Sequence, residues 1–170
     1  MLPFAAMTIA ALAADPASAT DINDLIDDLR ATMSSRVVII SLDAQNARLA
    51  GLDQAEIERL DQEWRAETES DNQPLIAQLM GNPLSSYLIR KKAESNGLFT
   101  EIFVFDARGM NVGQSSVTSD YWQGDEDKFE KTVAVGPDAV FIDEIEFDEE
   151  MRQNQRQVSF VITDPETREP

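Results

Sequence analysis

The stretch "LFTEIFVFDARG", residues 98–109, decides the fold class of this 170-residue chain. Its β-branched and aromatic residues predict a strand that is buried on both faces, and the closing Asp-Ala-Arg-Gly predicts a tight turn. Residues 110–116 then predict the returning strand of a hairpin. The sequence changes here from a helical pattern to a sheet pattern.

The residues before the hairpin carry the pattern of helices. Apolar residues recur at three- and four-residue steps, as in an amphipathic helix: Ile22, Leu25, Ile26, Leu29, Met33 and Val37. This stripe predicts one long helix over residues 21–50. The β-branched run at residues 37–40 would also suit a strand, but no turn signal separates it from its flanks.

Local signals place the shorter helices. Asp53 and Glu56 have the spacing of a capping box, which predicts a second helix over residues 53–67. Pro74 and Pro83 each suit the first turn of a further short helix. Residues 20–97 are therefore predicted to be the helical part of the protein.

The residues after the hairpin return to a strand pattern. Phe129 and Val133 predict a short helix, and residues 139–147 and 152–163 predict strands. This order predicts an α+β fold in which helices pack on a central antiparallel sheet built from residues 98–170.

The composition excludes several classes of protein. With 14 basic and 32 acidic residues the chain has a formal charge of −18, which repels nucleic acid and anionic membrane surfaces. The absence of cysteine and histidine removes thiol nucleophiles, disulfides, the usual general base and the commonest zinc ligand. We therefore expect a non-enzymatic protein without metal or cofactor. A hydrolase built on two carboxylates is the weakest alternative, because no acidic pair stands out from the surface charge.

The first residues, "MLPFAAMTIAALAADPASA" at positions 1–19, have the pattern of a signal peptide. An apolar run precedes Ala17-Ser18-Ala19, the small-x-small spacing that signal peptidase recognises. Cleavage there would export residues 20–170 to the periplasm as a single domain, with no membrane insertion afterwards. The run is too short to span a bilayer, and a buried or anchoring helix is the alternative. No basic residue precedes the run, so the true start of the chain is left open.

Two later stretches carry a family resemblance. Residues 102–132, "IFVFDARGMNVGQSSVTSDYWQGDEDKFEKT", and residues 141–165, "FIDEIEFDEEMRQNQRQVSFVITDP", resemble the periplasmic single Cache (PDC) sensor domains, which are relatives of the PAS fold. The most specific element is the run "SDYWQGD", residues 119–125, set after a DxxG hairpin. The resemblance covers residues 21–170.

The resemblance implies a PAS-like antiparallel sheet with the long helix behind it and a small-molecule pocket on the other sheet face. It implies an amino acid, amine or carboxylate as ligand, and a membrane histidine kinase, chemoreceptor or cyclase as signalling partner. The chain departs from the family in having no transmembrane helix and no output domain. It also stops where the family adds a final strand, which predicts an open edge at residues 157–163 unless the chain is a fragment or another strand fills the place.

The first candidate binding residues lie in the "SDYWQGD" run. Tyr121 and Trp122 have rings with a polar edge that suit a pocket wall, with core packing as the equal alternative. Asp120 is the acid best placed to face a ligand amine. Asp125 precedes two more acids and is better explained as the N-cap of the next helix than as a ligand contact.

Three further candidates alternate along the returning strand: Met110, Gln114 and Ser116. Alternation puts them on one face, which turns either toward the pocket or toward the helices. The sequence thus predicts an exported sensor that binds a small metabolite. The alternative is an exported scaffold of the same fold that binds no ligand. Ligand identity and oligomeric state are not determined by the sequence.

Overall fold

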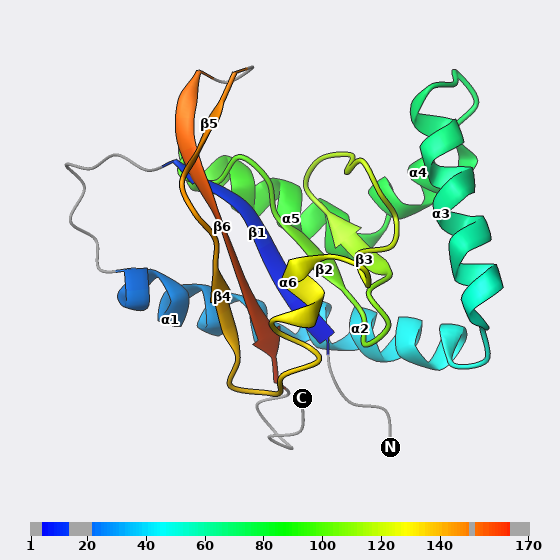
Figure 1. Ribbon diagram of the computed structural model, residues 1–170, viewed down its shortest axis with the longest axis horizontal. Helices are drawn as coiled ribbons and strands as arrows, with labels where there is room; N and C mark the ends of the chain where they lie inside the picture. Colours follow the sequence, from blue (N-terminus) through cyan, green and yellow to red (C-terminus); the bar gives the residue numbers. More distant parts are fainter. Residues whose placement is uncertain (1–4, 14–21, 150–151, 164–170) are drawn as a thin grey trace.

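A computed structural model describes residues 5–13, 22–149 and 152–163 of the chain. They form a mixed α+β fold in which helices pack on an antiparallel sheet, as the sequence predicts (Figure 1). The strands follow the order β3-β2-β1-β6-β4, and β5 also pairs with β6. The strand bounds are β1 Ala5–Ala13, β2 Phe103–Phe105, β3 Asn111–Gln114, β4 Val140–Ile142, β5 Glu146–Asp148 and β6 Gln153–Ile162.

The hairpin of β2 and β3 forms where the change of sequence pattern predicts it, and its strands pair antiparallel. Asp106 closes the turn, because its Oδ1 accepts the backbone N–H groups of Arg108 at 2.9 Å and Met110 at 3.0 Å. Gly109 has a φ of +85°, a left-handed conformation that favours glycine. The Asp-Ala-Arg-Gly signal is therefore confirmed.

The helix bounds are α1 Ile22–Met33, α2 Arg36–Leu49, α3 Gln54–Thr68, α4 Pro74–Met80, α5 Pro83–Glu94 and α6 Asp127–Glu130. The predicted single helix over residues 21–50 is thus two helices in the structure. Ser35 is extended, with ψ at 146°, and the Ser34 hydroxyl donates to the carbonyl of Arg30 at 2.8 Å. Serine side chains that bond to nearby backbone compete with a continuous helix. The apolar stripe hides this break because both helices bury residues in the same core.

The predicted helix starts are confirmed. Asp53 and Glu56 form the capping box of α3, with reciprocal bonds of 2.9 and 3.0 Å. The helices α4 and α5 begin at Pro74 and Pro83. These signals were readable because each involves residues within one helical turn.

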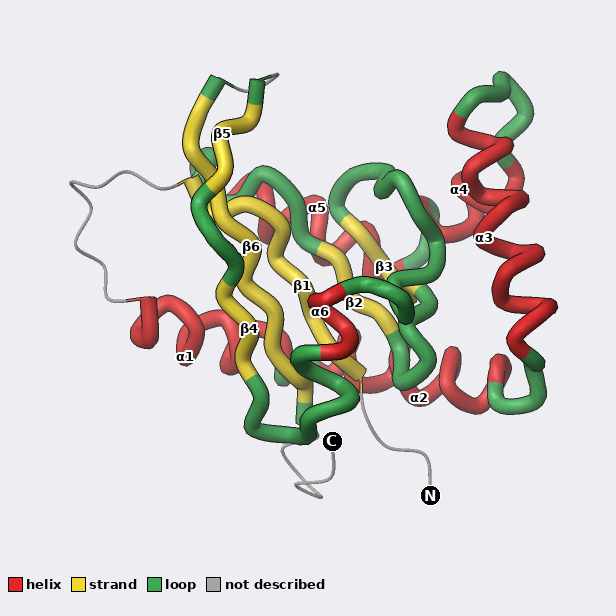
Figure 2. Tube along the Cα trace, in the orientation of Figure 1, coloured by secondary structure: helices red, strands yellow, loops and turns green. Residues whose placement is uncertain are grey.

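Three apolar clusters hold the layers together. The largest joins α1, α2 and α5 to one face of the sheet, through residues such as Leu29, Val38 and Phe160. On the other face, the phenyl rings of Phe103 and Phe105 pack with residues from α6 and the turn after it. The helices α3 and α4 form a pair beside the β3 edge and enclose the third cluster (Figure 2). The sheet is therefore covered on both faces at β2, whereas β4 and β5 are largely exposed.

Strand β1 lies in the centre of the sheet, antiparallel to β2 on one side and to β6 on the other. It falls inside the predicted signal peptide, and cleavage after residue 19 stays a prediction. Residues 158–162 of β6 are not an open edge, because β1 pairs with them, so the structure has the alternative in which another strand fills the place. Within the described ranges, no helix is long and apolar enough to cross a membrane.

Candidate functional site

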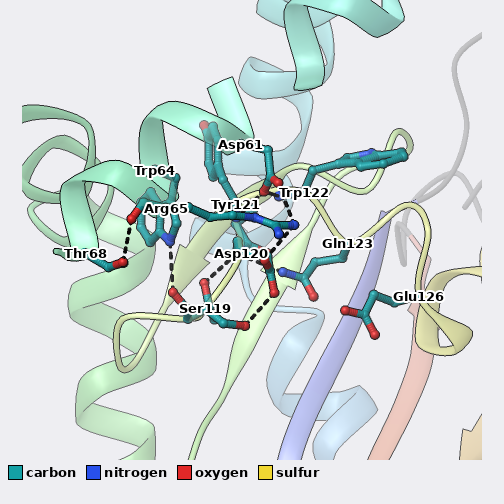
Figure 3. A network of polar contacts seen from close by, with 12 residues as sticks. Asp61, Trp64, Arg65, Thr68, Ser119, Asp120, Tyr121, Trp122, Gln123 and Glu126 are labelled. Atoms are coloured by element: carbon teal, nitrogen blue, oxygen red, sulfur yellow. Dashed lines mark hydrogen bonds and ion pairs between the residues drawn. The ribbon is translucent and has the colours of Figure 1, made fainter. Parts of the chain in front are cut away.

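The loop after β3 is held against α3 by polar contacts (Figure 3). Asp61 is buried, and its Oδ1 accepts the backbone N–H groups of Tyr121 and Trp122, both at 2.9 Å. Three residues further along α3, the Trp64 indole N–H donates to the Thr118 carbonyl at 2.9 Å. Residues at this spacing share one face of a helix, so α3 presents both side chains to the loop.

Arg65 completes this attachment. Its guanidinium lies 2.8 Å from Asp61 Oδ2 and 2.8 Å from Asp120 Oδ1. The two carboxylates, Asp61 first, raise the pKa of Arg65 above its ordinary value. The candidate acid Asp120 is therefore already paired with a cation of the protein, which argues against a role in holding a ligand amine.

Tyr121 is both a core residue and a wall of a groove. Its ring stacks on Trp64 with centroids 5.3 Å apart and planes 14° apart, and only 3% of the residue is exposed. Burial raises the pKa of the Tyr121 phenol above its ordinary value, and the charge of the nearby Arg48 guanidinium opposes this rise. Tyr121 and Arg48 both line this groove.

The groove has a volume of about 280 Å³ and lies between α2, α4 and the start of α5. Its polar lining consists of Ser41, Gln45, Arg48, Gln78, Asn82 and Tyr121. Its apolar lining includes Leu75, Leu79 and Val112. The groove therefore opens on the helix-covered side of the sheet, whereas the resemblance implies a pocket on the other face.

Gln45 orients the polar end of the groove. Its side chain is buried, and its amide nitrogen donates to Asp106 Oδ2 at 2.9 Å and to the carbonyls of Met110 and Asn111 at 3.1 Å each. These bonds leave the Gln45 carbonyl oxygen to accept from the Arg48 guanidinium at 3.2 Å. Arg48 itself is exposed and forms no ion pair within the described part of the chain. Arg48 is therefore positioned by a neutral amide and keeps an uncompensated charge.

Two of the predicted residues lie away from the groove. Trp122 is half-buried, donates to the Arg108 carbonyl at 2.8 Å and covers the backbone of Gly124. Asp125 is exposed, and the N-cap of α6 is Glu126, which makes no side-chain cap bond. The N-cap assignment of Asp125 is wrong by one residue, because the helix begins one position later than the acidic run suggests.

The strand residues Met110, Gln114 and Ser116 do not form one binding face. Met110 and Gln114 are fully buried, and the Ser116 hydroxyl accepts from Lys92 at 2.8 Å. The strand register shifts between β2 and β3, and this irregularity interrupts the alternation on which the prediction rested. Met110 joins the cluster around Trp64, so the core-packing alternative holds for it.

Apart from Tyr121, the groove is lined by residues that were not singled out from the sequence as binding candidates. Arg48 is one of the 14 basic residues of the chain, and no local motif distinguishes it from the others. Asp61 did carry a signal, because an acid four residues after Ile57 and three before Trp64 lies on the buried stripe of its helix. A carboxylate in such a position needs partners, and the loop N–H groups supply them.

A carboxyl group with a raised pKa, Glu101, lies apart from the groove. Burial raises the pKa of Glu101 to about 7, although the charges of Lys128 and Lys92 lower it. No group of three potential metal-ligating side chains occurs within the residues that the structure describes. Comparisons of the chain with protein-family models, curated proteins and solved structures found no match.

Proposed function

We propose that this protein is an exported, non-enzymatic sensor that binds a small carboxylate beside Arg48. The observation that carries the proposal is the charge of the groove. Among the described residues, Arg48 is the only charged one that lines the groove, although the chain has 32 acidic and 14 basic residues. A concave site that lacks carboxylates on so acidic a protein favours an anionic ligand over an amine. Of the ligands that the resemblance implies, namely amino acids, amines and carboxylates, the groove therefore favours carboxylates.

The lining suits such a ligand chemically. A guanidinium offers a planar set of donors that matches the two oxygens of a carboxylate. Asn82 and Ser41 supply further polar groups, and Leu79 and Val112 supply apolar surface for the rest of the molecule. Ligand pockets commonly start at about 300 Å³, so a groove of this size suits a metabolite of few atoms.

The sheet supports the Cache-like part of the proposal. The sheet is antiparallel and helices pack on one of its faces, and the resemblance implies both of these features. A domain of that class would pass the bound state of the groove to a membrane histidine kinase, chemoreceptor or cyclase. Because α2 and α4 both line the groove, a bound ligand would draw these two helices together and give the signal a structural path.

A scaffold that binds no ligand is the second candidate, and one observation favours it. Tyr121 is 3% exposed and stacks on Trp64, so the main predicted ligand residue already has a complete structural role. In this alternative the groove would be a surface depression, and the same fold would serve protein contact alone. The two functions differ in whether a small molecule stabilises the protein.

A thermal-shift screen of mono- and dicarboxylates, amino acids and amines tests the proposal. A ligand at a hundred times its Kd stabilises the folded state by about 2.7 kcal/mol, which corresponds to a rise of about 5–10 °C in Tm for a domain of this size. We expect carboxylates to raise the Tm and amines without a carboxylate to leave it unchanged. Arg48→Gln should abolish the rise, because it removes the guanidinium that would bind the carboxylate.

Arg36→Gln is the matched control, since Arg36 is exposed at the start of the same helix and does not line the groove. Its shift should equal that of the unmodified protein. Arg48→Gln should itself cost only about 0.3–1 kcal/mol, because the cation lies in the last turn of α2 and favours the helix dipole. A screen without hits, or equal shifts in both variants, would favour the scaffold.

A further inference from the structure

Strand β1 is the link between the two halves of the sheet. Met7 pairs with Val104 of β2 and with Phe160 of β6, and the β6 pairing extends from Ala5 to Ala13. In the described strand order, β2 and β6 do not pair with each other directly. Figure 1 shows β1 in dark blue between the two strands. The hairpin therefore joins the rest of the sheet through a strand from the other end of the chain.

The position between β2 and β6 is apolar on both faces. All three residues of β2 are buried, as are residues 158–162 of β6. Val104 and Phe160 belong to the helix-side core, whereas Phe103 packs with the α6 side. A strand that fits between such neighbours must be uncharged along both faces, since a buried unpaired charge is very costly. The sequence AAMTIAALA at residues 5–13 meets this requirement.

The predicted cleavage site is next to this strand in the sequence. Ala17-Ser18-Ala19 lies in sequence after β1 and before α1, which begins at Ile22. A cut there would separate β1 from the chain and leave every other described element intact. Without a strand in this position, the facing N–H and C=O groups of β2 and β6 would lose their partners.

We propose that the position between β2 and β6 is a strand-binding site. Its ligand is an extended, uncharged apolar segment that lies antiparallel to β6, and the chain's own Ala5–Ala13 is the occupant. Backbone pairing along two strands gives such a site its affinity, and the apolar faces give it specificity. The strand therefore stays bound after the chain is cut between β1 and α1, and it exchanges with free peptide of the same sequence.

Cross-linking tests where the strand lies in the uncut, full-length chain. The protein has no cysteine, so an engineered pair reports only its own contact. Thr8 lies opposite Ser159, so T8C with S159C should form a disulfide within one chain. The control M7C with S159C is shifted by one residue, which turns the two side chains to opposite faces, and it should not cross-link. Equal cross-linking of both pairs, or of neither, would overturn the proposal.

Exchange tests whether the position is a binding site. A protease site is placed within residues 14–21 of the full-length chain, the protein is cut, and a fluorescent peptide of residues 2–14 is added. We expect the cut pieces to co-elute and the labelled peptide to replace the bound strand. A control peptide with Met7→Asp and Ile9→Asp should bind at least tenfold more weakly, because it would place two charges opposite the buried Phe160 and Val158.

Two results would refute the inference. If the cut protein loses its N-terminal piece and does not take up the labelled peptide, β1 is an ordinary strand of a continuous chain. If T8C and S159C cross-link two chains of a dimer instead of one chain, the occupant is a second copy and the assignment to the chain's own strand fails. The inference is supported if the cut pieces co-elute, the labelled peptide replaces the bound strand, and T8C cross-links to S159C within one chain.

Discussion

Asp61→Ala should be one of the most damaging substitutions of a charged residue in this protein. Asp61 Oδ1 accepts two backbone N–H groups, those of Tyr121 and Trp122, at 2.9 Å each, and the residue is only 6% exposed. Alanine removes the carboxylate acceptor, so both backbone N–H groups lose their hydrogen-bond partner. The loop that carries the groove wall would then lose its main attachment to α3.

The contacts set the size of the effect. A hydrogen bond to a charged group contributes about 1.5–3 kcal/mol, so two such bonds correspond to about 3–6 kcal/mol. The ion pair of Asp61 with Arg65 adds little, because Arg65 is 56% exposed and exposed pairs contribute about 0–1 kcal/mol. We expect Asp61→Ala to lower the free energy of unfolding by about 3–5 kcal/mol. Asp61→Asn keeps an acceptor oxygen and should cost about half as much.

Urea unfolding followed by tryptophan fluorescence is the appropriate assay, since the two tryptophans, Trp64 and Trp122, both lie at this attachment. Glu63→Gln is the control on the same helix, because Glu63 is exposed and pairs only with the exposed Arg59. It should change stability by less than about 0.5 kcal/mol. If Asp61→Ala cost no more than Glu63→Gln, the proposed attachment of the loop would be refuted.

Three further predictions concern other parts of the fold. The pKa of Glu101 is about 7 in the folded protein and ordinarily 4.5. The neutral carboxyl therefore contributes to the stability of the folded state, fully below about pH 4.5, and this contribution is lost as the pH rises through 7. Chemical denaturation should show Glu101→Gln gaining up to about 3 kcal/mol over the unmodified protein between pH 5 and pH 8; a constant difference would contradict the burial of this carboxyl. Gly113→Ala should lower the free energy of unfolding by about 1–3 kcal/mol in urea, since the new Cβ would lie 2.6 Å from Cγ of buried Leu84; an unchanged midpoint would show that this contact relaxes. Asp125→Ala should leave the Tm within about 1–2 °C, because this exposed residue caps no helix; a loss near 1 kcal/mol would restore it as the cap.

The sequence by itself determined the elements whose signals are local. The Asp-Ala-Arg-Gly turn, the capping box at Asp53 and the proline-led starts of α4 and α5 all form as predicted. Each depends on residues a few positions apart, so the chain carries the whole interaction within one turn. The α+β class follows from the order of these elements.

The helix break shows where local patterns stop being informative. Periodicity records which residues are buried, and it continues unchanged across Ser34 and Ser35 because α1 and α2 bury their apolar residues in one core. The break itself depends on the extended backbone conformation of Ser35. Two adjacent serines alone do not determine this conformation. A stripe of apolar residues therefore predicted the buried face correctly and the number of helices incorrectly.

Only the tertiary structure decided the site. Gln45 reaches Asp106 across 61 positions and Asp61 reaches Trp122 across 61, so no sequence window contains either pair. The apolar run at residues 5–13 likewise suits a signal peptide and a central strand equally well, because both require uncharged residues. The apolar composition of such a segment suits any apolar environment. Only its pairing with distant strands determines where it lies.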